Sequence, residues 1–200
     1  MTINTIIFDF GGVLIDWNPR YLYRDLFDDP DKMEWFLENI CTGEWNLEQD
    51  RGRPLSVGTA LLKERFPEHE EFINSFYGKW EDMLKGEIRE TVEILYDLKK
   101  KYKVYGLTNW SAETFPIALK RFSFLKELDG IVVSGEEEMI KPDKKIFKLL
   151  LDRYYLKAEN SLFIDDNLDN IKAAAEMGFQ TIHFESAEKL KVQLAKMEIT

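Results

Sequence analysis

Apolar residues along this chain follow two different periodicities. Short apolar runs rich in β-branched and aromatic side chains, which are typical of buried strands, occupy residues 6–8, 104–107, 130–133, 161–164 and 180–184. Apolar residues at helical spacing occupy residues 91–100, 112–119, 144–154, 170–177 and 187–197. From residue 86 onward the strand and helix patterns alternate, which predicts a parallel sheet with crossover helices.

The region between residues 16 and 85 interrupts this alternation. It contains four stretches of amphipathic helical spacing, around residues 21–27, 33–40, 57–66 and 72–80, and no convincing strand. We therefore predict an α/β protein. Its core is a Rossmann-like, doubly wound parallel sheet formed by residues 1–15 and 86–200, with a small all-helical cap at residues 16–85 inserted after the first strand.

One cap segment, residues 42–52, lies between the expected helices and mixes Trp45 with polar residues. It could form a loop that faces the substrate. It could equally be a plain connection in which Trp45 fills the core of the cap, because large aromatic side chains often serve as packing area.

Composition and charge narrow the class of protein. With 44% hydrophobic residues in 200, the chain can bury a sizeable core. Its net charge of −10 opposes binding to nucleic acid or to an anionic membrane. The only cysteine, Cys41, excludes an internal disulfide. Neither a signal-peptide pattern nor a run of about 18 apolar residues occurs, so we expect a cytoplasmic protein, a monomer or a homodimer.

Polar residues follow four of the predicted strands. They are Asp9, Thr108 with Asn109, Lys141, and Asp165 with Asp166. A doubly wound sheet brings the carboxyl ends of its strands to one edge, where ligands bind. Two glycines, Gly11 and Gly12, come shortly after Asp9 and would let backbone N–H groups approach an anion closely. The pattern predicts a site for a small phosphorylated metabolite.

These residue types suit metal-assisted phosphoryl transfer. A carboxylate such as Asp9 can attack phosphorus and form an aspartyl-phosphate, and Asp9, Asp165 and Asp166 offer the oxygen ligands that Mg²⁺ prefers. Phosphate oxygens would be held by Lys141, Thr108, Asn109 and the backbone N–H groups of Phe10 and Gly11. Two like charges about 4 Å apart repel by roughly 4 kcal/mol at an effective dielectric near 20, so cations are required here.

Together, these motifs make the chain resemble the haloacid dehalogenase-like (HAD) hydrolase superfamily. The matching segments are Phe-Asp-Phe-Gly-Gly-Val at 8–13, Leu-Thr-Asn at 107–109, Lys-Pro-Asp at 141–143 and Phe-Ile-Asp-Asp-Asn at 163–167. The resemblance implies Asp9 as nucleophile, Thr108 and Lys141 as phosphate binders, and Asp9 with Asp166 as Mg²⁺ ligands, Asp165 being less certain. It also implies that the backbone carbonyl of Gly11 binds the metal and that residues 16–85 form the family's helical cap.

Gly11 departs from the family pattern. Most phosphatases of the superfamily carry a second aspartate at this position, two residues after the nucleophile, as general acid and base. The remaining Asp-x-Gly-x-Val pattern resembles the branch that contains the alpha-D-glucose-1-phosphate phosphatase. Either the substrate has a leaving group that needs little protonation, such as an anomeric sugar phosphate, or a cap carboxylate such as Glu44, Glu48 or Asp50 serves as the acid.

Two other functions compete with phosphatase activity. The superfamily's 2-haloacid dehalogenases also lack the second aspartate, but they need no metal and keep no acidic pair corresponding to Asp165 and Asp166. A non-catalytic phosphate-binding protein is the second alternative. It would leave the joint presence of Asp9, Thr108, Lys141 and the acidic pair unexplained.

Overall fold

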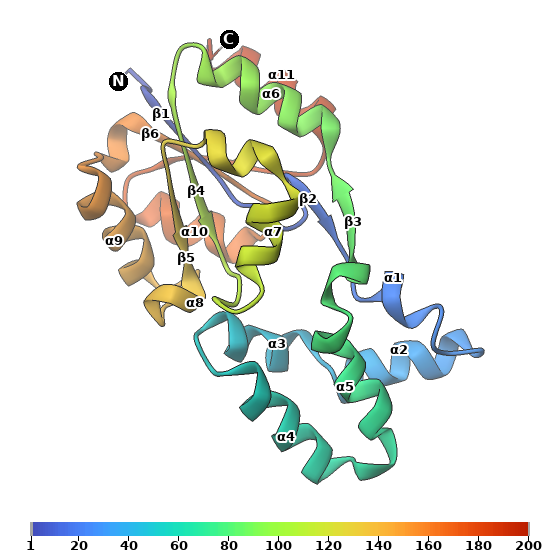
Figure 1. Cartoon of the computed structure of the whole chain (residues 1–200). Helices are drawn as coiled ribbons and strands as arrows, with labels where there is room; N and C mark the ends of the chain where they lie inside the picture. Colours follow the sequence, from blue (N-terminus) through green and yellow to red (C-terminus); the bar gives the residue numbers. More distant parts are fainter. Residues whose placement is uncertain (1, 200) are drawn as a thin grey trace.

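The computed structural model describes residues 2–199, and a parallel sheet forms its centre (Figure 1). The strands, in their spatial order, are β5 (Gly130–Val133), β4 (Lys103–Thr108), β1 (Thr5–Phe8), β6 (Ser161–Asp165) and β7 (Gln180–His183). Each pairs in parallel with its neighbours, and β1 lies in the middle. Because the chain adds strands on both sides of β1, the predicted doubly wound α/β fold is confirmed.

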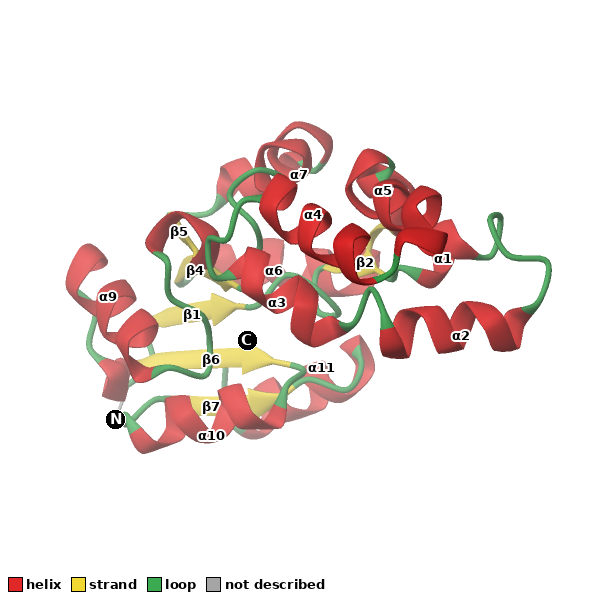
Figure 2. Ribbon diagram, turned by 90° about the horizontal axis from the view of Figure 1, so that it is seen from below, coloured by secondary structure: helices red, strands yellow, loops and turns green. Residues whose placement is uncertain are grey.

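Helices cover both faces of this sheet, and the alternation of side chains along β1 decides what each face buries. Ile6 and Phe8 belong to the core under α6 (Arg89–Lys99) and α11 (Ala187–Lys196). Ile7 points to the opposite core, under α9 (Lys144–Tyr154) and α10 (Leu168–Glu176). Figure 2 shows the sheet between these layers.

The remaining helices of the core are short. They are α7 (Phe115–Arg121), α8 (Ser134–Glu137), η3 (Ser123–Glu127) and η4 (Ala158–Asn160). Within residues 2–199, every helix is too short or too polar to cross a lipid bilayer.

The cap is a separate group of helices beyond the carboxyl ends of the strands (Figure 1). It contains α1 (Arg20–Tyr23), α2 (Pro30–Asn39), α3 (Gly43–Asp50), α4 (Leu55–Arg65), η1 (Pro67–His69), α5 (Glu70–Gly78) and η2 (Trp80–Met83). Aromatic rings fill its interior, with Tyr23, Phe36 and Phe76 almost fully buried. These rings belong to the same cluster of buried residues as Ile6 and Phe8 of β1, so the interior of the cap is continuous with one core of the sheet.

Helix α3 occupies the segment for which the sequence suggested a loop or connection. The Thr42 hydroxyl caps it by accepting a hydrogen bond from the Trp45 backbone N–H at 3.0 Å. Trp45 is buried in the cap and donates its indole N–H to the Gly58 carbonyl. Gly43, in the first turn, has a low helix propensity, and most of the residues after it are polar. The apolar spacing that indicates a helix is therefore weak in this segment.

Two short strands mark the passages between core and cap, and here the expectation of no strand was wrong. Strands β2 (Ile15–Trp17) and β3 (Leu84–Glu87) pair antiparallel and form a two-stranded ribbon. They contain three and four residues, too few for an alternating pattern to be recognised in the sequence. The ribbon joins the cap to the core at two points, because β2 follows β1 and β3 leads into α6 (Figure 1).

Candidate active site

The parallel register brings the predicted strand-end residues to one edge. Phe8 pairs with Gly106 of β4 on one side and with Ile164 of β6 on the other. The residues that follow Phe8 and Ile164 along their strands therefore lie side by side. The Asp9 N–H donates to the Ile164 carbonyl at 2.9 Å. Asp9 and Asp165 thus end neighbouring strands.

Lys141 is the cation at the centre of this edge. Its Nζ lies 2.9 Å from Asp9 Oδ1 and 2.7 Å from Asp165 Oδ2, and the side chain is 1% exposed. Asn109 fixes the backbone of the same residue, because its Oδ1 accepts from the Lys141 N–H at 2.8 Å and its Nδ2 donates to the Lys141 carbonyl at 3.0 Å. Asn109, which the sequence offered as a phosphate binder, therefore also positions Lys141.

Asp165 is held from several sides. Besides Lys141, the Asn170 amide donates to both of its carboxylate oxygens at 3.1 and 3.0 Å. The Asn167 backbone N–H donates to Oδ1 at 2.8 Å. With its carboxylate fully buried and saturated by donors, Asp165 is the group that anchors Lys141.

Asp166 lies in a different environment from its neighbour. It is exposed, and within residues 2–199 its carboxylate makes no hydrogen bond to another side chain. It approaches the loop after β1 so closely that a Cβ on Gly12 would collide with it, and Gly12 has a φ of +74°. The His183 ring contacts the Asp166 carbonyl at 2.9 Å and fixes the loop. Asp166 therefore has a free carboxylate beside Asp9.

The three carboxylates fit a divalent cation. Asp9, Asp165 and Asp166 each offer an oxygen, and these atoms lie within 4.8 Å of one another. Opposite them stands the single positive charge of Lys141, which leaves an excess of negative charge at a mostly buried place. Mg²⁺ prefers oxygen ligands, and a group of carboxylates whose negative charge exceeds the positive charge beside it is a favourable place for this ion. Asp166 and Asp9 have the geometry to hold it, since the Asp165 carboxylate is occupied by its donors.

Burial also sets the protonation of these groups. It raises the pKa of Asp9 to about 7, an effect that Lys141 opposes and Asp165 reinforces. Burial likewise raises the pKa of Asp166, with repulsion from Asp165 adding to it. For Lys141, burial opposes the charge, but attraction to Asp165 and Asp9 is stronger and raises its pKa. A bound cation would return Asp9 to the ionised form that a nucleophile requires.

A buried hydroxyl without a partner lies at the end of β4. Thr108 is 1% exposed, and its Oγ1 has no hydrogen-bond partner among residues 2–199. Buried polar atoms are rarely left unsatisfied, so this donor is available to a ligand oxygen. Phe10 offers only its backbone, because its ring packs between Gly106 and Phe115 and its N–H donates to Asp9 Oδ1 at 2.7 Å.

A small cavity of about 80 Å³ separates this edge from the cap. Its lining comes from both parts of the molecule: Gly11, Asn109 and Trp110 from the core, Trp17 from β2, and Asn46, Asp50 and Trp80 from the cap. The indole N–H groups of Trp17 and Trp80 are buried and have no partner in the described part of the chain. Trp80 lies outside the motifs, and its sequence pattern predicted only a residue of the last cap helix, not a place in this cavity.

Asp50 is the cap carboxylate that reaches the cavity. It is the last residue of α3 and is 8% exposed, whereas Glu44 and Glu48 on the same helix are exposed. Burial raises the pKa of Asp50 to about 7, with the Ser111 backbone opposing and Asp9 reinforcing the shift. Asp50 is therefore the cap carboxylate that lies near enough to Asp9 for its charge to act on it.

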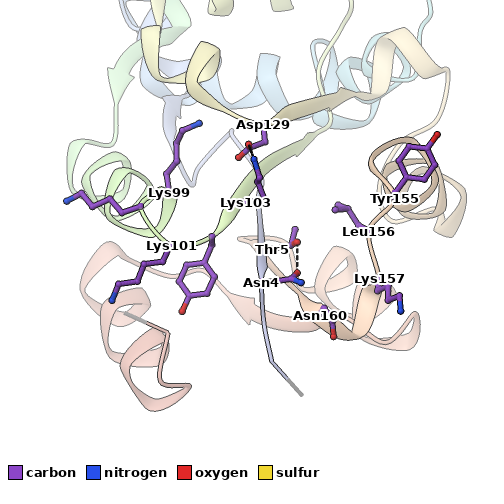
Figure 3. A pocket seen from close by; sticks show the side chains of 12 residues that line it. Asn4, Thr5, Lys99, Lys101, Lys103, Asp129, Tyr155, Leu156, Lys157 and Asn160 are labelled. Carbon is purple, nitrogen blue, oxygen red and sulfur yellow. Dashed lines mark hydrogen bonds and ion pairs between the residues drawn. The ribbon is translucent and has the colours of Figure 1, made fainter.

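A wider hollow lies elsewhere, at the amino ends of the strands (Figure 3). It is an open groove of about 790 Å³ that includes Thr5 at the start of β1, Lys103 at the start of β4 and Asn160 before β6. Lys99, Lys101 and Lys157 border it. Because it lies at the other end of the strands from Asp9, it takes no part in the site.

Comparison with known proteins agrees with this architecture. The family model of haloacid dehalogenase-like hydrolases matches residues 3–178. Sesquiterpene phosphatase astK of Aspergillus oryzae is 30% identical over 187 residues, covering 91% of this chain and 90% of its own. Drimenol cyclase drtB of Aspergillus calidoustus is 25% identical over 199 residues, 98% of this chain, but the match spans only 36% of that longer protein.

A solved structure of the same fold is the HAD family enzyme bt-2542 from Bacteroides thetaiotaomicron in its magnesium complex. It superposes with a TM-score of 0.76 at 22% identity, covering 97% of this chain and 99% of the other. The fold and the strand-end motifs define a hydrolase with an aspartate at the end of its first strand. The chain belongs to the haloacid dehalogenase-like hydrolase family, as its motifs suggested.

Proposed function

We propose that this hydrolase is a Mg²⁺-dependent phosphatase that cleaves a small phosphate ester through an aspartyl-phosphate on Asp9. The observation that carries the proposal is the arrangement around the Asp9 carboxylate. Lys141 lies 2.9 Å away, Asp166 presents a free carboxylate beside it, and Thr108 supplies an unpartnered hydroxyl at the end of the next strand. A relative that is 30% identical carries the name of a phosphatase.

In this reaction an Asp9 carboxylate oxygen attacks phosphorus, and the bond from phosphorus to the ester oxygen breaks. Lys141 Nζ remains beside Asp9 and is placed to neutralise charge on the transferring phosphoryl group. The Thr108 hydroxyl donates to a phosphate oxygen. Bound Mg²⁺, with Asp9, Asp166 and the Gly11 carbonyl as ligands, would supply the positive charge that lets two anions approach.

The cavity suits a small leaving group that offers both an apolar face and hydrogen-bonding groups. It holds about 80 Å³, and the indole N–H groups of Trp17 and Trp80 are donors that an alkyl chain would leave unsatisfied. Hydroxyl groups of a sugar would satisfy them, and sugar faces stack well on aromatic rings. A sugar phosphate is therefore the substrate class we propose.

A direct assay tests the function. Phosphate release should be measured over a panel of sugar phosphates and nucleotides, with and without Mg²⁺, for the wild type and for Asp9→Asn. Release that needs Mg²⁺ and is lost in the variant is expected. Metal-independent chloride release from a 2-haloacid, without phosphate release, would instead establish the dehalogenase alternative. Phosphate binding without any turnover would establish the non-catalytic one.

A further inference from the structure

In the proposed reaction, no residue described so far protonates the leaving group. An alkoxide leaving group needs a proton, and Gly11 stands where the family's general acid would be. The space is open as well, because a Cβ on Gly11 would meet nothing within 4 Å. A donor for the ester oxygen must therefore come from another part of the molecule.

We propose that Asp50 of the cap is this general acid and base. The inference rests on the proposed phosphatase function. Asp50 and Gly11 line the same small cavity, which places Asp50 across this cavity from the position of the family's usual acid. Glu44 and Glu48 lie on the same helix but are exposed, which excludes them from the cavity in this conformation.

A buried chain of hydrogen bonds orients the Asp50 carboxyl. Gln49 Nε2 donates to the Tyr77 hydroxyl at 2.9 Å, and Tyr77 donates to Asn46 Oδ1 at 2.8 Å. Asn46 Nδ2 then donates to Asp50 Oδ2 at 3.1 Å. Gln49 and Asn46 are buried. Removing their polar groups from water costs free energy that a solvent-exposed helix end does not lose.

The backbone of Asp50 is fixed to the core at the same point. Its carbonyl accepts a hydrogen bond from the Ser134 hydroxyl at 2.5 Å, and the Trp110 N–H donates to that hydroxyl at 2.9 Å. Asp50 therefore belongs to the site only when the cap is closed over the core. Burial of its carboxyl favours the protonated form that an acid needs.

The proton balance of the two steps is complete. As Asp9 attacks phosphorus, the ester bond breaks, its electron pair goes to the ester oxygen, and the Asp50 proton passes to that oxygen to release the alcohol. Water then attacks the aspartyl-phosphate, its proton returns to Asp50, and the electron pair of the broken bond returns to Asp9. Both carboxyl groups end in their starting states.

The test compares leaving groups within one preparation of each variant. Asp50→Asn keeps the size and hydrogen bonds of the side chain but cannot give up a proton. We expect it to lose on the order of 10²–10⁴-fold in kcat/KM for alkyl phosphates, whose leaving groups are poor. With 4-nitrophenyl phosphate, whose leaving group needs no proton, kcat/KM should change little, because it reports the step that forms the aspartyl-phosphate and not the later hydrolysis in which Asp50 is the base. Glu44→Gln, on the exposed face of the same helix, should leave both rates unchanged.

The ratio of the kcat/KM values for alkyl phosphates and for 4-nitrophenyl phosphate distinguishes a catalytic role of Asp50 from a structural one. A partly folded or loosely capped variant loses kcat/KM for both substrates in proportion, so equal losses of kcat/KM with both substrates, or no loss with either, would overturn the proposal. Asp50→Ser should show the same split if Asp50 is the acid. Absence of phosphate release by the wild type, or turnover by Asp9→Asn, would instead refute the underlying phosphatase function.

Discussion

Lys141 Nζ and Asp165 Oδ2 lie 2.7 Å apart with both side chains completely buried. Removing two charges from water costs several kcal/mol each, and the attraction between them offsets this only where further hydrogen bonds satisfy the pair. Asn170 and Asn167 provide those bonds to Asp165. These contacts hold the Lys141 ammonium group beside Asp9.

Breaking this pair should affect folding as well as activity. In Asp165→Asn, Lys141 keeps Asp9 as its remaining carboxylate partner. We expect the free energy of unfolding to fall by about 3–5 kcal/mol, because a buried charge loses its closest partner. Urea denaturation monitored by circular dichroism measures this change. Unaltered stability would mean that Asp165 does not anchor Lys141.

Asp166→Asn should behave differently from the variant of its neighbour. Although Asp166 is exposed, partial desolvation and repulsion from Asp165 raise its pKa, so removing its charge relieves this repulsion in the folded state. We expect stability to be kept while the Mg²⁺ concentration needed for half-maximal activity rises. Activity measured across a Mg²⁺ titration checks this. An unchanged Mg²⁺ dependence would remove Asp166 from the ligand set.

The sequence was sufficient to predict the core edge of this site. Asp9 and Asp165 follow apolar runs that are recognisable as strands, and parallel topology alone requires their carboxyl ends to meet. The cap half was not predictable to the same degree. Whether Asp50 or Glu48 faces inward depends on the register of α3, whose apolar pattern is too weak to show which side is buried.

The place of Trp80 in the cavity could not be predicted from the sequence either. It contributes an unpartnered indole N–H to the cavity, yet its position there depends on how η2 and the β2–β3 ribbon place the cap over the core. Such contacts between distant segments leave no local signal. The sequence suggested that a cap carboxylate could act as acid, but the choice among three candidates required the packed structure.

Gly106 on β4 should be intolerant of substitution. A Cβ at this position would collide with the Phe10 ring, which fills the space above the strand. We expect Gly106→Ala to lower the free energy of unfolding by about 1–3 kcal/mol, the usual cost of overpacking a core. Gly86→Ala on β3 is the matched control, because a Cβ there meets nothing within 4 Å. Equal thermal stability of the two variants would contradict this packing.

Asp50 should also impose a pH dependence on stability. Burial raises its folded pKa from the ordinary 3.8 to about 7. Between these values the folded state holds a proton that the unfolded state has lost, so stability falls as pH rises through this range. Asp50→Asn removes this titration, and each pKa unit is worth about 1.4 kcal/mol. The free energy of unfolding of the variant minus that of the wild type should therefore be larger at pH 8 than at pH 4.

Urea denaturation at a series of pH values measures this difference. Asp9 contributes a fall of the same sign, but it is present in both proteins and cancels in the comparison. A stability difference that does not change with pH would show that the Asp50 carboxyl is not shifted by burial.

Gly11→Asp should restore a general acid at the position usual in the family. The backbone of Gly11 is not in the positive-φ region that favours glycine, and its Cβ position is free within 4 Å, so an aspartate fits without strain. In the Asp50→Asn background, Gly11→Asp should recover hydrolysis of alkyl phosphates while changing the rate with 4-nitrophenyl phosphate little. In the wild-type background the same substitution should add little, because one proton donor already serves the ester oxygen. The measurement is kcat/KM for both substrates in all four proteins. Strictly additive effects of the two substitutions would contradict a shared role for positions 11 and 50, whereas rescue would show that the cap replaces what the strand-end loop has lost.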